Sequence, residues 1–281
     1  MNRKIEIATA TTLDIKLRGL NDRREELNIA LYEEELSRRK KLKIHRYTLG
    51  IGLFFVLLLL INLVLTISIE TTALYTGIGM LISFGSLAIF GLAYLFQELA
   101  YRARIKKVFI PSFIKVFFPQ FEYEHNLHIE SYKIPELLND SGSNRVEIQK
   151  GEDYLSGRIG SLFVELSELE MTQNLLIDGP INGFKGIFMR IAGFPKQRNL
   201  DFVLNNEPLQ KVLKEMESFW NKKPALVLDK EGYLCVFVHT RKSFLESSPR
   251  EHFLESELFQ RVYLELYHLL HFVELLDIDK D

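Results

Sequence analysis

Carboxylates and glycines gather in one short stretch of the chain, residues 151–169, which reads GEDYLSGRIGSLFVELSEL. Two carboxylates held close together can act as a general acid and a general base. Asp153, Glu165 and Glu168 are therefore the candidate acid–base groups. The same side chains are also typical of the edge of a solvated hairpin, where they do no chemistry. Because no Ser/His/Asp arrangement and no metal-ligand spacing accompanies them, we expect no catalytic triad, no metal ion and no cofactor.

The glycines of this stretch do not match a nucleotide-binding loop. No Gly-Lys-Ser/Thr follows, and the spacing in SGRIG differs from the dinucleotide fingerprint. A phosphate cradle uses a helix N-terminus, whereas strand-like alternation lies on both sides here. The pattern instead predicts a hairpin with strands over 152–159 and 161–169 and a two-residue turn at Gly160 and Ser161. Gly157 inside a strand indicates a bulge or the close approach of another backbone.

Three further groups of residues could suggest a metal or thiol site, but each is better explained by an ordinary structural role. Glu122-x-x-His125 and Glu265-x-x-His268 match the spacing of half a di-iron site, but such a site needs two more glutamates on other helices. His239 lies four residues after Cys235, and on a strand this separation is about 13 Å, too far for a thiol dyad. As the single cysteine of the chain, Cys235 can form no intramolecular disulfide.

Two long uncharged runs precede this region, over 48–69 and 71–97. About 20 helical residues cross a bilayer core, and in lipid each backbone amide needs a partner within its own segment, so both runs are predicted to be transmembrane helices. Only Glu70 separates them, which predicts a tight helical hairpin. A cleaved signal peptide fits poorly, because a long segment precedes the first run.

Basic residues flank the outer ends of this hairpin and are absent from its turn. By the positive-inside rule, both termini are expected to be cytoplasmic, which we interpret as a protein of the bacterial inner membrane. Such clusters can also attract anionic lipid headgroups. The flanking basic residues are Arg38, Arg39, Lys40, Lys41, Lys43, Arg46, Arg102, Arg104, Lys106 and Lys107.

Small residues in the second run suit close helix packing. Ala73-x-x-x-Gly77 and Gly79-x-x-x-Ser83 would let another helix approach. The partner helix is either the first run of the same chain or a second copy in a homo-oligomer. Asn62 is expected to bond across the hairpin, since a transport path usually needs ionisable groups and the two runs contain none.

The segment before the membrane, residues 12–46, predicts a helix interrupted near Gly19. Its leucines recur at coiled-coil spacing, and the stripe either packs on the protein's own domain or forms a coiled coil. The predicted organisation is a helical arm over 1–47, a transmembrane hairpin over 48–97, a juxtamembrane segment over 98–145 and a cytoplasmic domain over 146–281. The leucines of the stripe are Leu13, Leu17, Leu20, Leu27 and Leu31.

The cytoplasmic domain alternates strand-like and helix-like segments. Pro111 and Pro119 limit any helix in the link over 107–121, and NDSGSN at 139–144 predicts a loop. Helices are expected over 207–220 and, at the C-terminal end, over 254–276. This order favours an α+β fold with a largely antiparallel sheet and a long C-terminal helix. Beyond the hairpin, strands are predicted over 184–192, 200–204, 224–229 and 232–239.

The stretch GEDYLSGRIGSLFVELSELEM, followed by FKGIFMRIAGF at 184–194 and then YLCVFVHTRKSFLES, resembles the bacterial domain-of-unknown-function family 3137. Members of that family carry similar motifs and often an N-terminal membrane hairpin. The resemblance spans most of residues 100–280 and is most specific over 151–194; the segment after Pro195 is shorter here than is usual in the family. It implies the fold and the membrane context, and it implies no activity.

Three functions are compatible with these patterns. The first is a membrane-anchored module that binds a protein, a lipid headgroup or a small ligand. The second is a membrane-bound enzyme, such as a hydrolase, that uses the carboxylates of the 151–169 hairpin. The third is an oligomeric channel or transporter subunit. With a net charge of −2 the chain has no nucleic-acid signature. The predicted contact residues are Gly151, Glu152, Asp153, Tyr154, Gly157, Gly160, Ser167 and Glu168.

Overall fold

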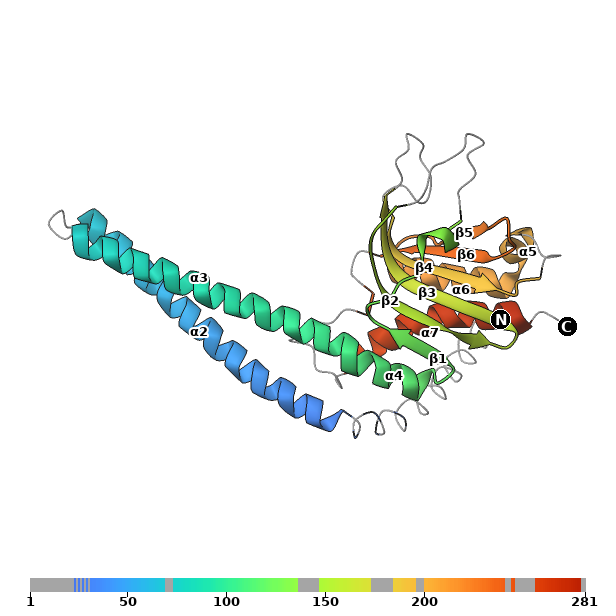
Figure 1. Cartoon of the computed structure of the whole chain (residues 1–281), viewed down its shortest axis with the longest axis horizontal. Helices are drawn as coiled ribbons and strands as arrows, with labels where there is room; N and C mark the ends of the chain where they lie inside the picture. The colour runs from blue at the N-terminus through green and yellow to red at the C-terminus, as the bar shows by residue number, and fades with distance from the viewer. Residues whose placement is uncertain are drawn as a thin grey trace, which may run out of the picture. The chain divides into compact units, whose positions relative to one another are not determined.

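The computed structural model describes Arg23, Glu25, Leu27 and Ile29 and residues 31–68, 73–135, 147–172, 184–195, 200–240, 244–245 and 256–278. These residues form two compact units. One contains the long helices α2 and α3 (Figure 1). The other contains the elements from Lys106 onward, and we call it the α+β domain.

Helices α2 (Tyr32–Ser68) and α3 (Ala73–Arg104) are both longer than the apolar runs that predicted them. Leu42–Val64 and Gly77–Phe117 are long and apolar enough to cross a membrane. The predicted turn at Glu70 lies outside the described residues. Since α2 is continuous from Tyr32, the arm helix runs into the first apolar run without a break. Large apolar side chains exposed on these helices include Leu53, Phe54, Leu57, Leu60, Ile82, Phe84, Ile89, Leu92 and Phe96.

The two helices pack against each other (Figure 1) through one of the predicted small-residue pairs. A Cβ atom at Gly79 would lie only 2.8 Å from Oδ1 of Asn62, so only a glycine lets α2 come this close. The rings of Phe55 and Phe90 stack with their centroids 5.7 Å apart. Around Gly77, by contrast, a Cβ would meet no described atom within 4 Å. Asn62 therefore lies at the contact between the helices, and its predicted bond across the hairpin stays a prediction.

The described residues of the N-terminal arm agree with packing on the protein's own domain. Nη1 of Arg23 donates to the carbonyl oxygen of Val116 at 3.3 Å, and Leu27 is fully buried. The other predicted features of the arm, including Gly19 and most of its leucine stripe, lie outside the described residues.

The α+β domain is built on a six-stranded sheet in the order β1-β2-β3-β4-β6-β5. Every pair of neighbouring strands is antiparallel, which confirms the antiparallel sheet predicted for the α+β domain. The strands are β1 (Phe121–Glu124), β2 (Glu147–Ile159), β3 (Leu162–Thr172), β4 (Phe184–Ala192), β5 (Ala225–Leu228) and β6 (Leu234–His239).

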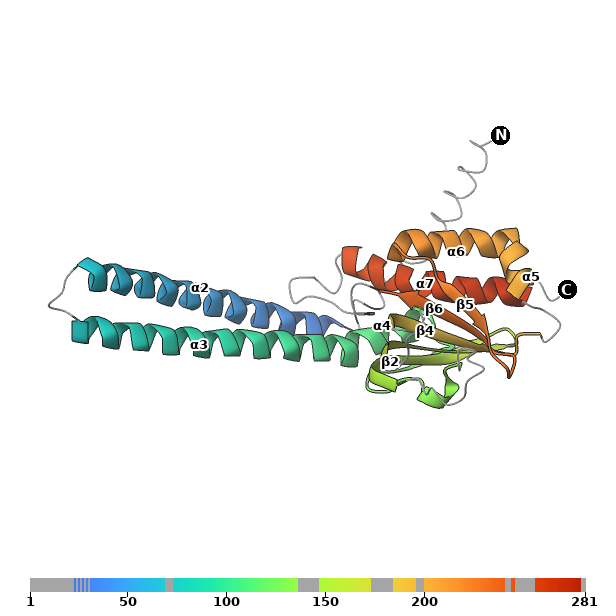
Figure 2. The same ribbon diagram turned by 90° about the horizontal axis from the view of Figure 1, so that it is seen from above.

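The two faces of the sheet are covered differently. Helices α6 (Glu207–Trp220) and α7 (Ser256–Ile278) lie on one face (Figure 2), which we call the helix face. Both helices were predicted. The opposite face carries an aromatic core that is closed by the segment around the 3₁₀ turn η3 (Ser131–Lys133). This core contains Ile129, Ile134, Leu169, Met171, Phe184, Phe188, Cys235 and Phe237.

Two predictions about local structure were wrong. The predicted strand at 200–204 is helix α5 (Leu200–Asn205), because a short apolar run suits either element and only Val203 is buried. The proline-flanked link is largely helical, with a π-helical turn η2 (Ile105–Phe109) and helix α4 (Ile110–Phe117). Pro111 lies just after the π-helical turn and does not interrupt the helix, whereas α4 ends at Phe117, before Pro119, as this proline predicted. The predicted loop at 139–144 lies outside the described residues.

Candidate functional site

The predicted hairpin is present, and its tip is held by the C-terminal helix. Gly160 has φ of +55°, a left-handed value that glycine adopts without strain. Ser161 donates to Oδ1 of Asp277 twice, from its backbone N at 3.2 Å and from its hydroxyl at 2.8 Å. Gly160 and Ser161 thus have a structural role at the turn.

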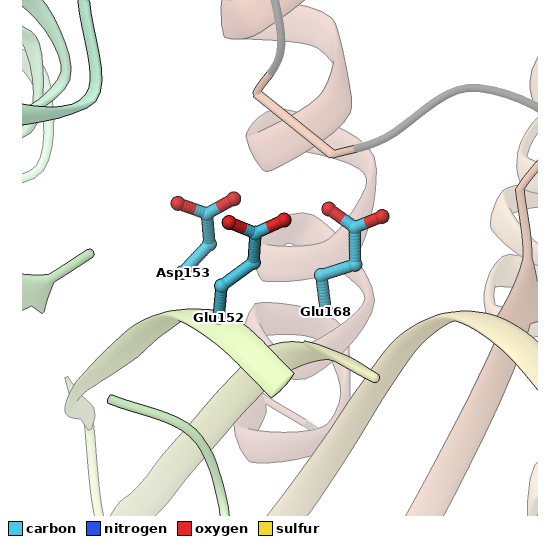
Figure 3. A group of neighbouring side chains, drawn as sticks. All are labelled: Glu152, Asp153 and Glu168. Carbon is cyan, nitrogen blue, oxygen red and sulfur yellow. The ribbon is translucent and has the colours of Figure 1, made fainter. Parts of the chain in front are cut away.

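A β-bulge near the start of β2 brings three carboxylates together. Glu152 pairs with Glu168 and Leu155 pairs with Leu166, so β2 contains one more residue than β3 between these pairs. Asp153 is the bulged residue, and its φ is +60°. As a result Glu152, Asp153 and Glu168 all point to the helix face (Figure 3), with one oxygen of each within 4.8 Å of the others. We call these three residues the carboxylate cluster.

A lysine and a tyrosine hold the buried member of this cluster. Nζ of Lys106 lies 2.5 Å from Oδ2 of Asp153 and 3.0 Å from Oε2 of Glu152. The hydroxyl of Tyr123 on β1 donates to Oδ1 of Asp153. Nζ of Lys150 donates to the other oxygen of Glu152 at 2.9 Å. Asp153 is fully buried, and these partners compensate its charge.

Glu168 has weaker compensation. The backbone N of Phe244 donates to its Oε2 at 2.8 Å. The next amide, that of Leu245, donates to Glu265 on α7 at 3.2 Å. Two carboxylates on the helix face therefore fix the short segment 244–245, whose Leu245 has φ of +54°.

Burial is the main cause of the raised pKa values of two of the three carboxyl groups. It raises the pKa of Asp153 to about 6 and the pKa of Glu168 to about 7. For Glu152 burial acts in the same direction, but hydrogen bonds and charge from Lys150 and Lys106 outweigh it and lower the pKa. The cluster can therefore take up and release protons near neutral pH.

The space beside the cluster limits what chemistry it can do. The cavity next to Glu152 and Glu168 has a volume of about 10 Å³, which is room for about one water molecule. Three carboxylates at this spacing could hold a metal ion, with oxygen ligands that suit Ca²⁺ or Mg²⁺. Lys106, however, already supplies a cation to Asp153 and Glu152.

The third candidate acid–base residue, Glu165, lies elsewhere. On β3 it is an odd number of residues from Glu168, so the two side chains point to opposite faces. Glu165 accepts hydrogen bonds from Lys133 at 2.7 Å, Tyr154 at 2.9 Å and Arg190 at 3.2 Å. Asp153 and Glu168 thus converge as predicted, while Glu165 belongs to a separate ion-pair network on the other face.

The remaining predicted contact residues have packing roles. At Gly157 a Cβ would lie 2.5 Å from the carbonyl oxygen of Gln120, which confirms close approach by the chain beside β1. At Gly151 a Cβ would meet the ring of His128. Ser167 is fully buried and accepts from the backbone N of Ile129 at 3.1 Å. Since Asp153, Ser167 and Glu168 are buried, they are not available on the surface, and a binding role for the hairpin stays a prediction.

The basic residues that flank the apolar runs have different environments. Lys106 is in the carboxylate cluster with its side chain only 11% exposed. Its neighbour Lys107 is exposed. The side chains of Arg38, Lys41 and Arg102 lie outside the described part of the structure. Before the first run, the exposed basic side chains are Arg39, Lys40, Lys43 and Arg46.

The other constellations behave as polar or core residues. Glu122 lies on β1 and is exposed. His268 packs against the ring of Phe219, and Glu265 accepts a backbone hydrogen bond. Cys235 is fully buried, and burial raises the pKa of its thiol to about 12. Its thiol is therefore an unreactive core group.

Sequence reasoning missed Tyr123, Lys133 and Arg190 and placed Lys106 only beside the membrane. Arg190 left a signal, because it is the one charged residue in the apolar run GIFMRIA of strand β4, and such a charge needs a buried partner. The sequence contains no comparable signal for Lys106, since it lies 47 residues from its partner Asp153.

The fold and the site define a protein with an apolar helical hairpin and an antiparallel α+β domain that contains a buried carboxylate cluster. No family model, curated protein or solved structure matches the chain. The family resemblance over residues 151–194 therefore stays a prediction.

Proposed function

We propose that this chain is a membrane-anchored binding module, with α2 and α3 as a transmembrane hairpin and the α+β domain as the part that binds. The observation that supports the anchor is the exposure of large apolar side chains along both helices. In water a surface of this extent would drive association. In a bilayer it faces lipid acyl chains, and the two helices satisfy their own backbone groups.

The proposal places both termini in the cytoplasm of a bacterium, with the hairpin in the inner membrane. The exposed basic residues Lys40, Lys43 and Arg46 before the first apolar stretch support this orientation. They are also available to anionic lipid headgroups. Lys106 contributes less to such binding, because its ammonium group is paired with Asp153 and Glu152.

A binding role fits the domain better than the enzyme alternative. The carboxylate cluster meets one condition for acid–base catalysis, since Asp153 and Glu168 converge and have raised pKa values. Among the described residues, the cavity beside the cluster is only about 10 Å³, which is too small for a substrate. The channel alternative would need several hairpins around a pore.

Cysteine labelling tests the anchor and its orientation. In intact spheroplasts a membrane-impermeant maleimide should react with Glu70→Cys, and with Lys40→Cys or Lys185→Cys only after permeabilisation. Cys235 does not interfere, because it is buried and its thiol pKa is raised to about 12. Opposite accessibility of Lys40→Cys and Lys185→Cys would exclude a two-span hairpin.

Proximity cross-linking in native membranes tests the binding role. A partner should be captured in equal yield by the wild-type chain and by Glu168→Gln, since the Glu168 side chain is buried and therefore not available at the surface. Self-cross-links alone would instead favour an oligomer and count against the binding module. A partner or activity lost specifically in Glu168→Gln would favour the enzyme alternative.

A further inference from the structure

A larger cavity lies on the face of the sheet opposite α7 and is separate from the carboxylate cluster. Its volume is about 350 Å³, within the range of small-molecule sites. One wall is the segment that contains η3, another is β5 with the turn after it, and Arg190 of β4 completes the lining. The apolar lining residues are Ile134, Pro135, Val227 and Leu228.

Arg190 has an unused edge at this cavity. Its side chain is 10% exposed, and its guanidinium carbon lies 3.4 Å from the centroid of the Tyr233 ring. Nη1 donates to Glu165 at 3.2 Å. Nε is buried and has no hydrogen-bond partner among the described residues. Nη2 has a contact with Glu231 at 3.6 Å, which is too long for a hydrogen bond.

Nε and Nη2 form one side of the guanidinium fork, the side that can bind a carboxylate through two parallel hydrogen bonds. An arginine that is stacked on a tyrosine and tied at Nη1 holds this edge in a fixed orientation. The group now nearest to the edge is the carboxylate of Glu231, whose side chain is 73% exposed. An exposed side chain with one long contact is held weakly and is readily displaced.

The charges around the cavity select the kind of anion. Lys133, Arg190 and Lys230 supply three positive charges. Glu165 behind Arg190, together with Asp229 and Glu231 in the turn, supplies three negative ones. A singly charged carboxylate that replaces Glu231 keeps this balance, whereas a phosphate dianion adds an uncompensated charge.

We propose that this cavity binds a small organic monocarboxylate, whose carboxylate pairs with the Nε–Nη2 edge of Arg190 and whose apolar body lies against Ile134 and Val227. Tyr132, which is exposed at the rim, would cover a planar body from outside. The inference gives a ligand class to the binding role proposed above. It does not depend on the membrane anchor, so the two can fail separately.

Ligand-observed NMR on the full-length protein in nanodiscs tests the inference. The probes are phenylacetate and hexanoate, with phenylacetamide as the uncharged control and inorganic phosphate as the second anion. At least one carboxylate should bind with a Kd of about 1 mM or lower, and phenylacetamide should bind at least about 10-fold more weakly, because a charge-assisted pair is lost. Arg190→Lys keeps the charge but loses the fork, so it should weaken binding about 10-fold or more.

Glu231→Gln provides a test that does not disturb the buried network. If the exposed carboxylate competes with the ligand, its removal should tighten carboxylate binding about 3-fold or more. Glu217→Gln, an exposed glutamate on α6, is the matched control and should change nothing.

Three results would overturn the inference. They are no carboxylate binding below about 10 mM, equal binding of phenylacetate and phenylacetamide, and an unchanged affinity in Glu231→Gln. Tighter binding of inorganic phosphate than of either carboxylate would replace the ligand class with a phosphate. The binding measurements use the full chain and do not depend on its orientation in a membrane. They can therefore be interpreted even if the labelling experiment shows that α2 and α3 do not span the membrane.

Discussion

Glu152 and Asp153 are consecutive residues of strand β2, and yet both carboxylates point to the same face of the sheet (Figure 3). The bulge at Asp153 causes this, since an extra residue in one strand shifts the alternation of its side chains. Lys106 can then contact both carboxylates with one ammonium group. A regular strand would have directed Asp153 to the opposite face, away from Lys106.

The first prediction concerns pH. The pKa of Glu168 is raised in the folded protein, from an ordinary value of 4.5 to about 7. The folded state therefore binds the proton more tightly, so this contribution to stability is full below pH 4.5 and is lost as the pH rises through about 7. Glu168→Gln, which mimics the protonated form, should stabilise the domain by about 2 kcal/mol at pH 7.5 and by little at pH 5.

Urea unfolding followed by the fluorescence of Trp220 measures this effect. Trp220 is the only tryptophan of the chain and lies in the α+β domain, so the helical hairpin gives no signal. The stability difference between Glu168→Gln and the wild type should widen between pH 5 and pH 8. This comparison cancels the contributions of the histidines at 125, 239 and 268, whose lowered pKa values act on wild-type stability in the opposite direction. Glu170→Gln serves as the control at a more exposed position. A stability difference between the variant and the wild type that shrinks over this range would contradict the prediction.

The second prediction separates the two lysines after α3. Lys106→Met leaves two carboxylates without their shared cation and should lower the free energy of unfolding by about 3 kcal/mol. Lys107→Met changes an exposed residue and should cost less than about 0.5 kcal/mol. The same Trp220 fluorescence assay measures both. Equal effects of the two substitutions would mean that the ion pair does not stabilise the domain.

The third prediction compares two glycines of β2. Gly157→Ala places a methyl group 2.5 Å from the backbone oxygen of Gln120, which cannot move without shifting the chain beside β1. We expect a loss of about 2 kcal/mol. Gly151→Ala brings its methyl group against Cγ of His128 and 2.6 Å from Cβ of the same residue. Turning the ring does not move Cβ, so the exposed segment at His128, which lies outside any helix or strand, must shift. Its cost should be about 1 kcal/mol, below that of Gly157→Ala. Thermal unfolding of both variants measures the two losses of stability. A larger loss in Gly151→Ala than in Gly157→Ala would refute the steric explanation.

The fourth prediction concerns the contact between α2 and α3. Cysteines at positions 55 and 90, in Phe55→Cys/Phe90→Cys, replace rings that stack across the two helices and should form a disulfide on oxidation. Gly79→Ile forces Asn62 away and should lower the disulfide yield severalfold. Gly77→Ile is the matched control, because no described atom lies within 4 Å of its Cβ position. A drop in both variants would indicate a general effect of isoleucine.

The sequence was sufficient for features that depend on local periodicity. The apolar runs, the turn at Gly160 and helix α6 follow from run length, glycine position and helical periodicity, and each is present. The predicted strand at 200–204 was wrong because a segment of five residues has too little periodicity to distinguish a strand from a turn of helix.

The candidate site could be predicted only in part. Strict alternation separates Glu165 from Glu168, and this alone would have removed Glu165 from the acid–base group. The position of Asp153 depends on a non-glycine residue with positive φ, for which a sequence has no reliable signal. The partners of the cluster come from distant segments, since Lys106 and Tyr123 are 47 and 30 residues from Asp153.

The hydrogen bonds between Ser161 and Asp277 have a consequence for the order of events during translation. They join residues that are 116 positions apart, so the tip of the hairpin stays unsecured until the end of α7 has left the ribosome. Contacts of such long sequence separation form slowly. A stalled or C-terminally trimmed chain would already carry its apolar helices but would have an unfinished sheet, which exposes it to proteolytic quality control.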